Sequence, residues 1–265
     1  MLPPVVLITG ASSGLGAALA LEHARLGHAV VLFARRDTRA AARALAGLPG
    51  AAGALSVRGD VTRRSDLDRA VRAALKRFGR LDVVYANAGY GVRGRIDELD
   101  LERWRQQQAV NVEGLLNTVW ATLPALKASR GRLELIGSVL GFGVVPGNGA
   151  YAASKFAVRA ISLALEEELR EDGVSVTHLA PGFFDSEFRL RGDDRKLDPR
   201  RPDSAPKGWS IPAAKAARRV SRAVLERRRE LVFPWHGRLT AFLFHYFPAG
   251  ATRLAGWARQ RASKP

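Results

Sequence analysis

Short apolar runs alternate along the chain with longer segments in which apolar residues recur every three or four positions. A short apolar run predicts a strand buried on both faces, and the longer period predicts an amphipathic helix. On this basis we predict strands at residues 5–9, 29–34, 54–58, 81–86, 132–137, 174–180 and 231–233. Helices are predicted at residues 15–26, 38–46, 65–78, 102–129, 151–171 and 212–228.

The alternation of strand and helix predicts one doubly wound α/β domain. Strands that alternate with helices form a parallel sheet with right-handed crossovers and helices on both faces. Seven such strands fit a single seven-stranded sheet, so we expect one domain over residues 1–234 and a C-terminal extension over residues 235–265. We find no internal repeats, and residues 189–206, rich in charge, Gly and Pro, are expected to form a mobile surface loop.

Composition removes several classes of site. The 265 residues include no cysteine, which excludes disulfides and thiolate metal sites. The five histidines are scattered without ligand-like spacing, so no metal site is predicted. No basic segment precedes the first apolar run, and we therefore expect no signal peptide and a cytoplasmic protein.

The charge is strongly positive. A formal net charge of +17 and a pI near 11.3 favour an anionic partner, which could be a phosphorylated cofactor, an acidic membrane surface or nucleic acid. A compositional bias is the alternative explanation for part of the excess, because arginine is accompanied by abundant alanine and glycine. No nucleic-acid recognition motif accompanies the charge, so a nucleic-acid partner is not predicted.

A glycine-rich turn, Thr-Gly-Ala-Ser-Ser-Gly-Leu-Gly, connects the first predicted strand to the first predicted helix over residues 9–16. Glycines let a backbone turn tightly and approach a pyrophosphate, and a helix N-terminus favours negative charge. The spacing G-x-x-x-G-x-G differs from the usual G-x-G-x-x-G. The strand–turn–helix setting favours a nucleotide site over a simple turn.

Two arginines, Arg35 and Arg36, follow the second predicted strand. An acid at this place commonly binds the ribose 2′-hydroxyl of NAD, whereas an arginine accommodates the 2′-phosphate of NADP. Asp37 falls one or two residues too late and is expected to cap the next helix. We therefore favour NADP(H) over NAD(H), with two merely solvated arginines as the alternative.

Tyr151 and Lys155 are four residues apart and therefore share one face of a predicted helix. A cation about 4 Å away is worth roughly 4 kcal/mol at an effective dielectric near 20. Since one pKa unit is about 1.36 kcal/mol, we expect the lysine to lower the pKa of the tyrosine by about three units. A phenol with a pKa near neutrality suits proton transfer.

Together these motifs resemble the short-chain dehydrogenase/reductase family, with its Rossmann fold, over nearly the whole chain up to about residue 234. The glycine motif and the Tyr-x-x-x-Lys pair occur in the family's order and spacing, and Ser138 precedes Tyr151 by thirteen residues. Ala86 stands where a further asparagine is frequent, and Ser186 replaces a customary threonine. The other matches are Asp60-Val61, Asn87-Ala88-Gly89, Asn111 and Pro181-Gly182.

The resemblance implies a role for each matched residue. Tyr151 would be the general acid/base, Lys155 would lower its pKa and bind the nicotinamide ribose, Ser138 would orient the carbonyl or alcohol, and Asn111 would hold a water near Lys155. A purely structural Asn111 is the alternative. The residues expected to bind the dinucleotide are Gly10, Ser12, Ser13, Gly14, Leu15, Gly16, Arg35, Arg36, Asp60, Val61, Asn87, Ala88, Gly89, Tyr151, Lys155, Pro181, Gly182 and Ser186.

The expected activity is hydride transfer between NADP(H) and a small carbonyl or alcohol substrate, in an enzyme that is expected to be a homo-oligomer. The alternative is a non-catalytic nucleotide-binding or membrane-associated protein that keeps the fold. Apolar residues after Gly182 and between Ser138 and Tyr151 suggest an apolar and bulky substrate; the alternative is that the same residues close the core. The apolar residues concerned are Phe142, Val144, Val145, Phe183, Phe184, Phe188 and Leu190.

The extension after Pro234 carries aromatic and basic residues at helical spacing. Trp235, Leu239, Phe242 and Tyr246 fall on one face, and a second segment at residues 252–261 sets Leu and Trp against arginines. Its apolar run is far shorter than the ~20 residues that span a bilayer. Three roles stay open: a lid over the substrate cleft, packing against another subunit, or peripheral contact with an anionic membrane.

Overall fold

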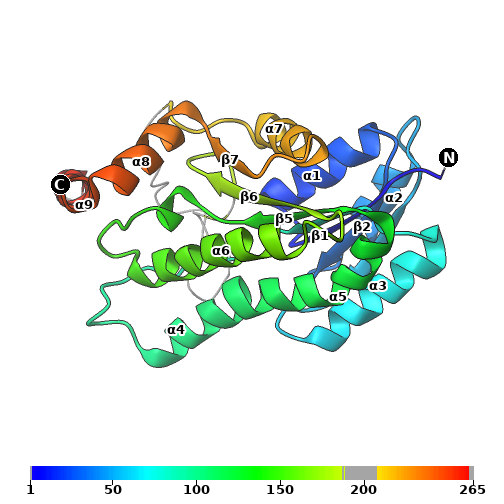
Figure 1. The fold of residues 1–265 in the computed structure, drawn as a ribbon, viewed down its shortest axis with the longest axis horizontal. Helices are drawn as coiled ribbons and strands as arrows, with labels where there is room; N and C mark the ends of the chain where they lie inside the picture. Colours follow the sequence, from blue (N-terminus) through cyan, green and yellow to red (C-terminus); the bar gives the residue numbers. More distant parts are fainter. Residues whose placement is uncertain (1, 187, 189–207, 263–265) are drawn as a thin grey trace.

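The computed structural model describes residues 2–186, 188 and 208–262. Within them a seven-stranded parallel sheet has the strand order β3-β2-β1-β4-β5-β6-β7 (Figure 1). The strands are β1 (Val5–Thr9), β2 (Ala29–Ala34), β3 (Ala54–Arg58), β4 (Val83–Ala86), β5 (Arg132–Ile136), β6 (Ser175–Pro181) and β7 (Glu230–Phe233). The predicted fold class is confirmed.

Helices cover both faces of the sheet, as the predicted parallel sheet requires. Their bounds are α1 (Gly14–Arg25), α2 (Arg39–Ala46), α3 (Arg64–Phe78), α4 (Leu101–Gln108), α5 (Gly114–Ser129), α6 (Gly149–Glu168), α7 (Ala213–Leu225), α8 (Trp235–Tyr246) and α9 (Pro248–Ala262). A π-helix η1 (Ala109–Glu113) joins α4 to α5, and a 3₁₀ turn η2 (Val139–Gly141) follows β5. Residues 189–206, predicted to be a mobile loop, lie outside the described residues.

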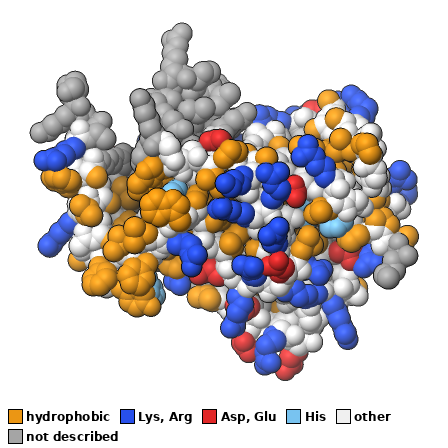
Figure 2. Space-filling view, turned by 90° about the horizontal axis from the view of Figure 1, so that it is seen from above, with side chains coloured by type: hydrophobic (Ala, Val, Ile, Leu, Met, Phe, Trp, Pro, Cys, Tyr) orange, Lys and Arg blue, Asp and Glu red, His pale blue; other side chains and the backbone are white. Residues whose placement is uncertain are grey.

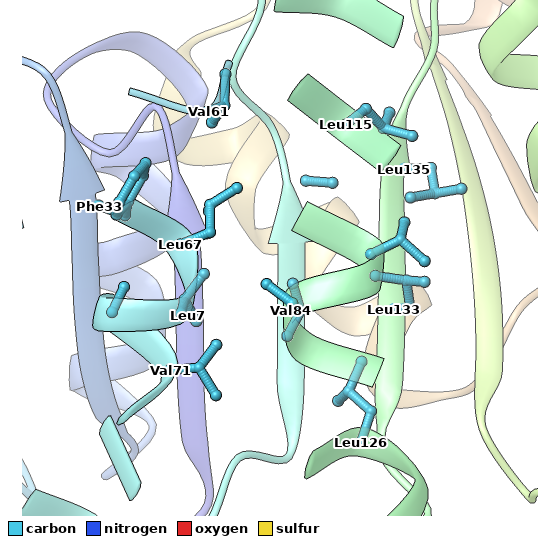
Figure 3. Close-up of a cluster of buried hydrophobic side chains, with 14 of the residues drawn as sticks. Leu7, Phe33, Val61, Leu67, Val71, Val84, Leu115, Leu126, Leu133 and Leu135 are labelled. Atoms are coloured by element: carbon cyan, nitrogen blue, oxygen red, sulfur yellow. The ribbon is translucent and has the colours of Figure 1, made fainter. Parts of the chain in front are cut away.

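Two apolar layers hold the sheet between the helices. One layer joins the sheet to α3, α5 and α6, and the other joins it to α1, α2 and α7. Figure 3 shows the first layer, where Leu67 of α3 lies beside Leu7 and Phe33 of the strands, and Leu115 of α5 lies beside Leu135 of β5. All five residues of β1 and all six of β2 are buried, because both sheet faces are covered.

The prediction of one continuous helix over residues 102–129 is wrong. The structure divides it into α4, η1 and α5, with the π-helical turn around Asn111. Asn111 bonds to the backbone of Tyr90 rather than to solvent, and Gly114 lies so close to Val61 that a Cβ would come within 2.6 Å of it. A π-turn adds a residue to the turn and is frequent at functional sites. Apolar periodicity does not reveal it.

The strand order reverses between β1 and β4, so a ligand-binding crevice is expected outside the carboxyl ends of these two strands. From β1 the chain builds outward to β3, then returns to the other side of β1 with β4. In open α/β sheets ligands bind at this reversal, outside the carboxyl ends of the strands. The glycine turn after β1 and the Asn87–Gly89 segment after β4 both open there.

The C-terminal extension forms two helices at the end of the molecule opposite the N-terminus (Figure 1). Helix α8 packs against β7 and η2, and α9 contacts α8. None of the helices among the described residues is long and apolar enough to cross a bilayer. The division of the chain at residue 234 stays a prediction.

Candidate active site

Three glycines shape the turn between β1 and α1. Gly10 and Gly14 have φ of 67° and 56°, a region that favours glycine. A Cβ on Gly16 would lie 2.5 Å from the carbonyl oxygen of Gly10, so only glycine fits there. Asn87 Nδ2 donates to Thr9 O (2.9 Å), which fixes the start of the turn to the end of β4.

The N-terminus of α1 follows this turn directly. Ser13 is the N-cap residue, and its side chain accepts no hydrogen bond from the first turn of α1. The first N–H groups of a helix have no partner within the helix and favour an anion. Leu15, in the same turn, is buried in the core, so its side chain anchors the helix and only its backbone can serve a ligand.

An arginine reaches from the end of β2 to the glycine turn. The Arg36 guanidinium donates to Ser12 Oγ (3.1 Å) and Ser13 Oγ (2.7 Å). Arg35 is exposed, and its carbonyl accepts from Arg58 Nε (3.0 Å). The structure thus brings Ser12, Ser13 and Arg36 together beside the N-terminus of α1.

Asp37 is turned to Arg39 and away from this group. Arg39 Nε and Nη2 donate to its carboxylate, and the Arg39 backbone N–H donates to Asp37 Oδ1 (2.9 Å). The hydrogen bonds from Arg39 lower the pKa of Asp37 to about 2. The N-cap residue of α2 is Thr38, so the prediction that Asp37 caps this helix is wrong for the position. Asp37 does accept a hydrogen bond from the backbone N–H of Arg39, the first residue of α2.

After β3, the two predicted residues have different surroundings. Asp60 Oδ1 accepts from the backbone and hydroxyl of Thr62 (3.0 and 2.9 Å). Val61 is buried against Gly114, and its carbonyl accepts from Asn117 Nδ2 (3.0 Å). Both lie between β3 and α3, on the β2 side of the crevice.

Ser138, Tyr151 and Lys155 come together at the carboxyl end of β5. Ser138 follows β5 and its hydroxyl accepts from Leu140 N (3.1 Å). Tyr151 lies in the first turn of α6, and Ser138 is near enough to its phenol to lower the pKa of Tyr151. Lys155 lies one turn further, with Nζ 5.5 Å from the centroid of the Tyr151 ring.

The predicted effect of Lys155 on Tyr151 is wrong in this structure. Burial raises the pKa of Tyr151 to about 12, and the hydrogen bond with Ser138 opposes that rise. Lys155 Nζ donates instead to the carbonyl oxygen of Ile136 (2.7 Å). Four-residue spacing fixes a shared helix face but leaves the direction of a flexible ammonium group free, and here β5 attracts it.

Lys155 is itself perturbed. It is 2% exposed, and burial lowers its pKa to about 8, while the carboxylate of Glu134 acts in the opposite direction. Glu134 is fully buried in β5, and among the described residues its two carboxylate oxygens have no hydrogen-bond partner. Burial raises the pKa of Glu134 to about 8, and Lys155 opposes this.

Asn111, in the π-helix η1, lies beside Lys155 and Ser154. Its Oδ1 accepts from Tyr90 N (3.0 Å), and its Nδ2 donates to Tyr90 O (2.9 Å) and to Ser154 Oγ (3.1 Å). A Cβ on Gly89 would lie 3.3 Å from this Oδ1 and 3.8 Å from Lys155 Nζ, so the two groups flank the same glycine. The predicted water path between them stays a prediction.

The residues after β6 lie on both sides of the crevice. Gly182 N donates to Phe233 O (2.7 Å), which continues the pairing of β6 with β7 past Pro181. Ser186 lies next to the glycine turn, since a Cβ on Gly14 would come 3.4 Å from Ser186 Cβ. The segment therefore crosses from the edge of the sheet back to α1.

The apolar residues suggested for the substrate separate into two groups. Phe188 lies beside the proposed acid, with its ring centroid 5.6 Å from that of Tyr151. Phe184 packs against the core beside α1 and α7, and Phe142 stacks under the Arg159 guanidinium. Leu190 lies outside the described residues. Phe188 is thus the apolar side chain that faces the reacting group.

Two residues of this site escaped the sequence prediction. Ser154 accepts from Asn111 and donates to Tyr151 O (2.7 Å), and a serine inside a helix pattern gives no signal of this. Glu134 had a signal, because a carboxylate in the apolar run Leu-Glu-Leu-Ile is rare in a central strand.

The observed cradle fits a dinucleotide. The turn tolerates no side chain at Gly10 or Gly16, α1 presents its N-terminus, and Arg36 lies at the side of the turn. These features suit a pyrophosphate with a further anionic group nearby. The described residues include no group of three or more His, Cys, Asp or Glu that could hold a metal ion.

Comparison with known proteins agrees with this geometry. A family model described as short chain dehydrogenase matches residues 4–195, and the chain therefore belongs to the short-chain dehydrogenase family. As a member it is an oxidoreductase that acts with NAD(P). An uncharacterized oxidoreductase from Staphylococcus epidermidis is 37% identical over 203 residues, which cover 73% of this chain and 85% of the relative.

Two solved structures show the same fold with different nucleotides. An alcohol dehydrogenase from the archaeon Thermococcus sibiricus, complexed with 5-hydroxy-NADP, has 30% identity and a TM-score of 0.73, covering 86% of this chain and 94% of its own. A short chain dehydrogenase/reductase from Burkholderia phymatum in complex with NAD has 26% identity and a TM-score of 0.79, covering 91% and 92%. Solved relatives thus bind either nucleotide.

Proposed function

We propose that this protein is an NADP(H)-dependent oxidoreductase that interconverts a ketone or aldehyde with the corresponding alcohol. The observation that carries the proposal is the convergence of Ser138, Tyr151 and Lys155 at the carboxyl end of β5, on the crevice that the glycine turn borders. A hydroxyl, a phenol and an ammonium group in one place suit proton transfer to or from a substrate oxygen.

Each side chain has a role that its contacts support. Ser138 would donate a hydrogen bond to the substrate oxygen and orient it, while Tyr151 would donate its proton to that oxygen in reduction and recover it in oxidation. Lys155, whose Nζ lies 5.5 Å from the centroid of the Tyr151 ring, would bind the ribose hydroxyls of the nucleotide. The bound nicotinamide would supply or accept the hydride.

The preference for NADP(H) rests on Arg36. Its guanidinium is already positioned on Ser12 and Ser13, where it would pair with a 2′-phosphate, and the nearby Asp37 is neutralised by Arg39. Arg35 would add charge at the same place. The backbone of residues 10–16, Asp60, Val61, residues 87–89 and residues 181–186 would hold the rest of the dinucleotide.

The substrate is proposed to be apolar next to the carbonyl, because Phe188 lies against Tyr151 at the crevice. We also propose a homo-oligomer. Exposed apolar side chains on the neighbouring helices α5 and α6, namely Trp120, Phe156 and Leu163, would be covered by another subunit.

A carbonyl panel tests this function. Ketones and aldehydes of increasing apolar size would be incubated with NADPH or NADH, and nicotinamide absorbance followed over time. We expect turnover of at least one apolar carbonyl, faster with NADPH, and none above background for Tyr151→Phe. Absence of turnover across the panel with both nucleotides, in protein that binds NADPH, would reject an oxidoreductase of this substrate class.

A further inference from the structure

The outer face of α8 and α9 carries large apolar side chains exposed to solvent. We name these the α8–α9 patch: Trp235, Leu239, Phe242, Tyr246, Phe247, Leu254 and Trp257, each at least half exposed. Figure 2 shows hydrophobic side chains gathered at this end of the molecule, with Lys and Arg side chains beside them. Contiguous exposed apolar surface of this kind marks an interaction site.

The patch is not needed to attach α8 to the body of the protein. Helix α8 buries Gly237, Ala241 and Phe244, and Phe244 fits so closely over Gly143 that a side chain there would overlap it. The exposed Leu239 and Phe242 occupy the opposite face, since two residues turn a helix by about 200°. A helix apolar on two faces buries one within the chain and offers the other to a partner.

The charged side chains of the C-terminal segment itself have one sign, and the acid at its border, Glu230 of β7, pairs with His178. Residues 235–265 include no Asp or Glu, but they do include four arginines and a lysine. Arg238 and Arg253 are exposed beside the patch, and the Arg261 guanidinium lies 3.8 Å from the centroid of the Trp257 ring. Aromatic residues interleaved with arginine match the interface of an anionic lipid bilayer.

We propose that the α8–α9 patch binds the surface of anionic membranes, with the aromatic side chains at the lipid interface and the arginines on lipid phosphates. The helices have 12 and 15 residues, which suits lying in the interface rather than crossing the bilayer. A second copy of the chain fits less well. A symmetric contact would bring two patches of the same positive charge together.

The position of the patch connects the membrane to the reaction site. Gly237 of α8 touches Val139, directly after Ser138, and Gly256 of α9 lies close to Pro146 in the segment that leads to Tyr151. A protein bound through this patch would hold its catalytic crevice near the lipid interface, where apolar carbonyl compounds accumulate. The binding itself does not depend on the proposed reaction.

Vesicle flotation of the full chain tests the proposal with two matched pairs of variants. Leu239→Ser removes a side chain that is 50% exposed in the patch, and Leu26→Ser removes one that is 48% exposed elsewhere. Arg253→Glu reverses an exposed charge beside the patch, and Arg72→Glu reverses one on α3. Circular dichroism would check folding of each variant.

We expect binding to phosphatidylcholine vesicles that contain phosphatidylglycerol and little binding to phosphatidylcholine alone. Each patch variant should bind roughly tenfold more weakly, from the loss of buried apolar area or of charge attraction, and each control should bind like the parent chain. Equal losses in patch and control variants, equal binding to both vesicles, or no binding would overturn the proposal. So would patch variants that dissociate an oligomer while vesicle binding is unchanged.

Discussion

Two cations lie near the carboxyl edge of the sheet, one at the end of β2 and one at the end of β5, and their surroundings differ. Arg36 is exposed at the end of β2, with its guanidinium fixed by two serine hydroxyls. Lys155 is 2% exposed at the end of β5, with its ammonium on a backbone carbonyl and a buried carboxylate nearby. The first cation faces solvent, whereas burial lowers the pKa of the second to about 8.

The difference in exposure between Arg36 and Lys155 indicates a different role for each cation. An exposed arginine recognises a phosphate through geometry and charge, and water screens it, so its removal should change selectivity modestly. A buried lysine acts on its neighbours in a low dielectric, so its removal should change chemistry strongly. The substitutions below test that contrast, from the largest expected effect to the smallest.

Lys155→Met should have the largest effect. Loss of the ammonium removes a buried positive charge close to Tyr151 and the proposed ribose contact, so we expect kcat to fall by about 10²–10⁴. Steady-state kinetics on a substrate found in the panel would measure it, with NADPH binding as the second readout. A fall of less than tenfold would contradict the role of Lys155.

Glu134→Gln tests the buried charge by its effect on stability. The pKa of Glu134 is about 8 when folded and near 4.5 as its ordinary value, so between these values the folded state binds more protons. Stability from this group is therefore present at low pH and declines as the pH rises from about 4.5 to about 8. Relative to the parent chain, the variant should gain a few kcal/mol over that window.

Urea unfolding of both proteins at pH 5 and pH 8 would measure this. The gain of the Gln variant should be larger at pH 8. A gain that is the same at both pH values would mean that Glu134 is ionised throughout, against the proposed effect of burial.

Gly16→Ala tests the close approach at the glycine turn. The new Cβ would lie 2.5 Å from Gly10 O, so the backbone of the turn must move. Overpacking of this kind costs about 1–3 kcal/mol, and we expect NADPH affinity to fall about tenfold. Gly47→Ala, where a Cβ meets its nearest atom at 3.6 Å, is the matched control and should bind normally in a nucleotide titration.

Arg36→Asp should have the smallest effect. Losing one charge-assisted contact to a 2′-phosphate costs about 1.5–3 kcal/mol before screening, so the ratio of NADPH to NADH affinity should fall roughly tenfold. Fluorescence titration with both nucleotides would measure that ratio. Arg43→Asp, on the exposed side of α2, should leave it unchanged, and an unchanged ratio for Arg36→Asp would remove the basis for NADP(H).

Much of the fold could be predicted from the sequence, because parallel strands buried on both faces appear as continuous apolar runs. The predicted β1, β2 and β3 match the observed bounds, whereas the predicted strand at residues 81–86 begins two residues before β4. The division of the predicted helix at Asn111 was missed, since the contact with Tyr90 comes from a distant segment.

The candidate site divides in the same way. Short-range features such as the glycine turn and the shared face of Tyr151 and Lys155 follow from local spacing. Burial and Ser138 set the pKa of Tyr151, and burial and Glu134 of β5 set that of Lys155, so the lowering predicted for Tyr151 was wrong. Local spacing brings groups together, but the surrounding fold sets their electrostatics.

The central claim, that Tyr151 exchanges the proton with the substrate oxygen, is tested most directly by single-turnover reduction with Tyr151→Phe. The substitution removes only the phenol oxygen, and NADPH would be premixed at saturation. We predict a hydride-transfer rate lower by about 10²–10⁴, with NADPH affinity within a few-fold of the parent chain. A rate within tenfold of the parent, at equal NADPH occupancy, would contradict it.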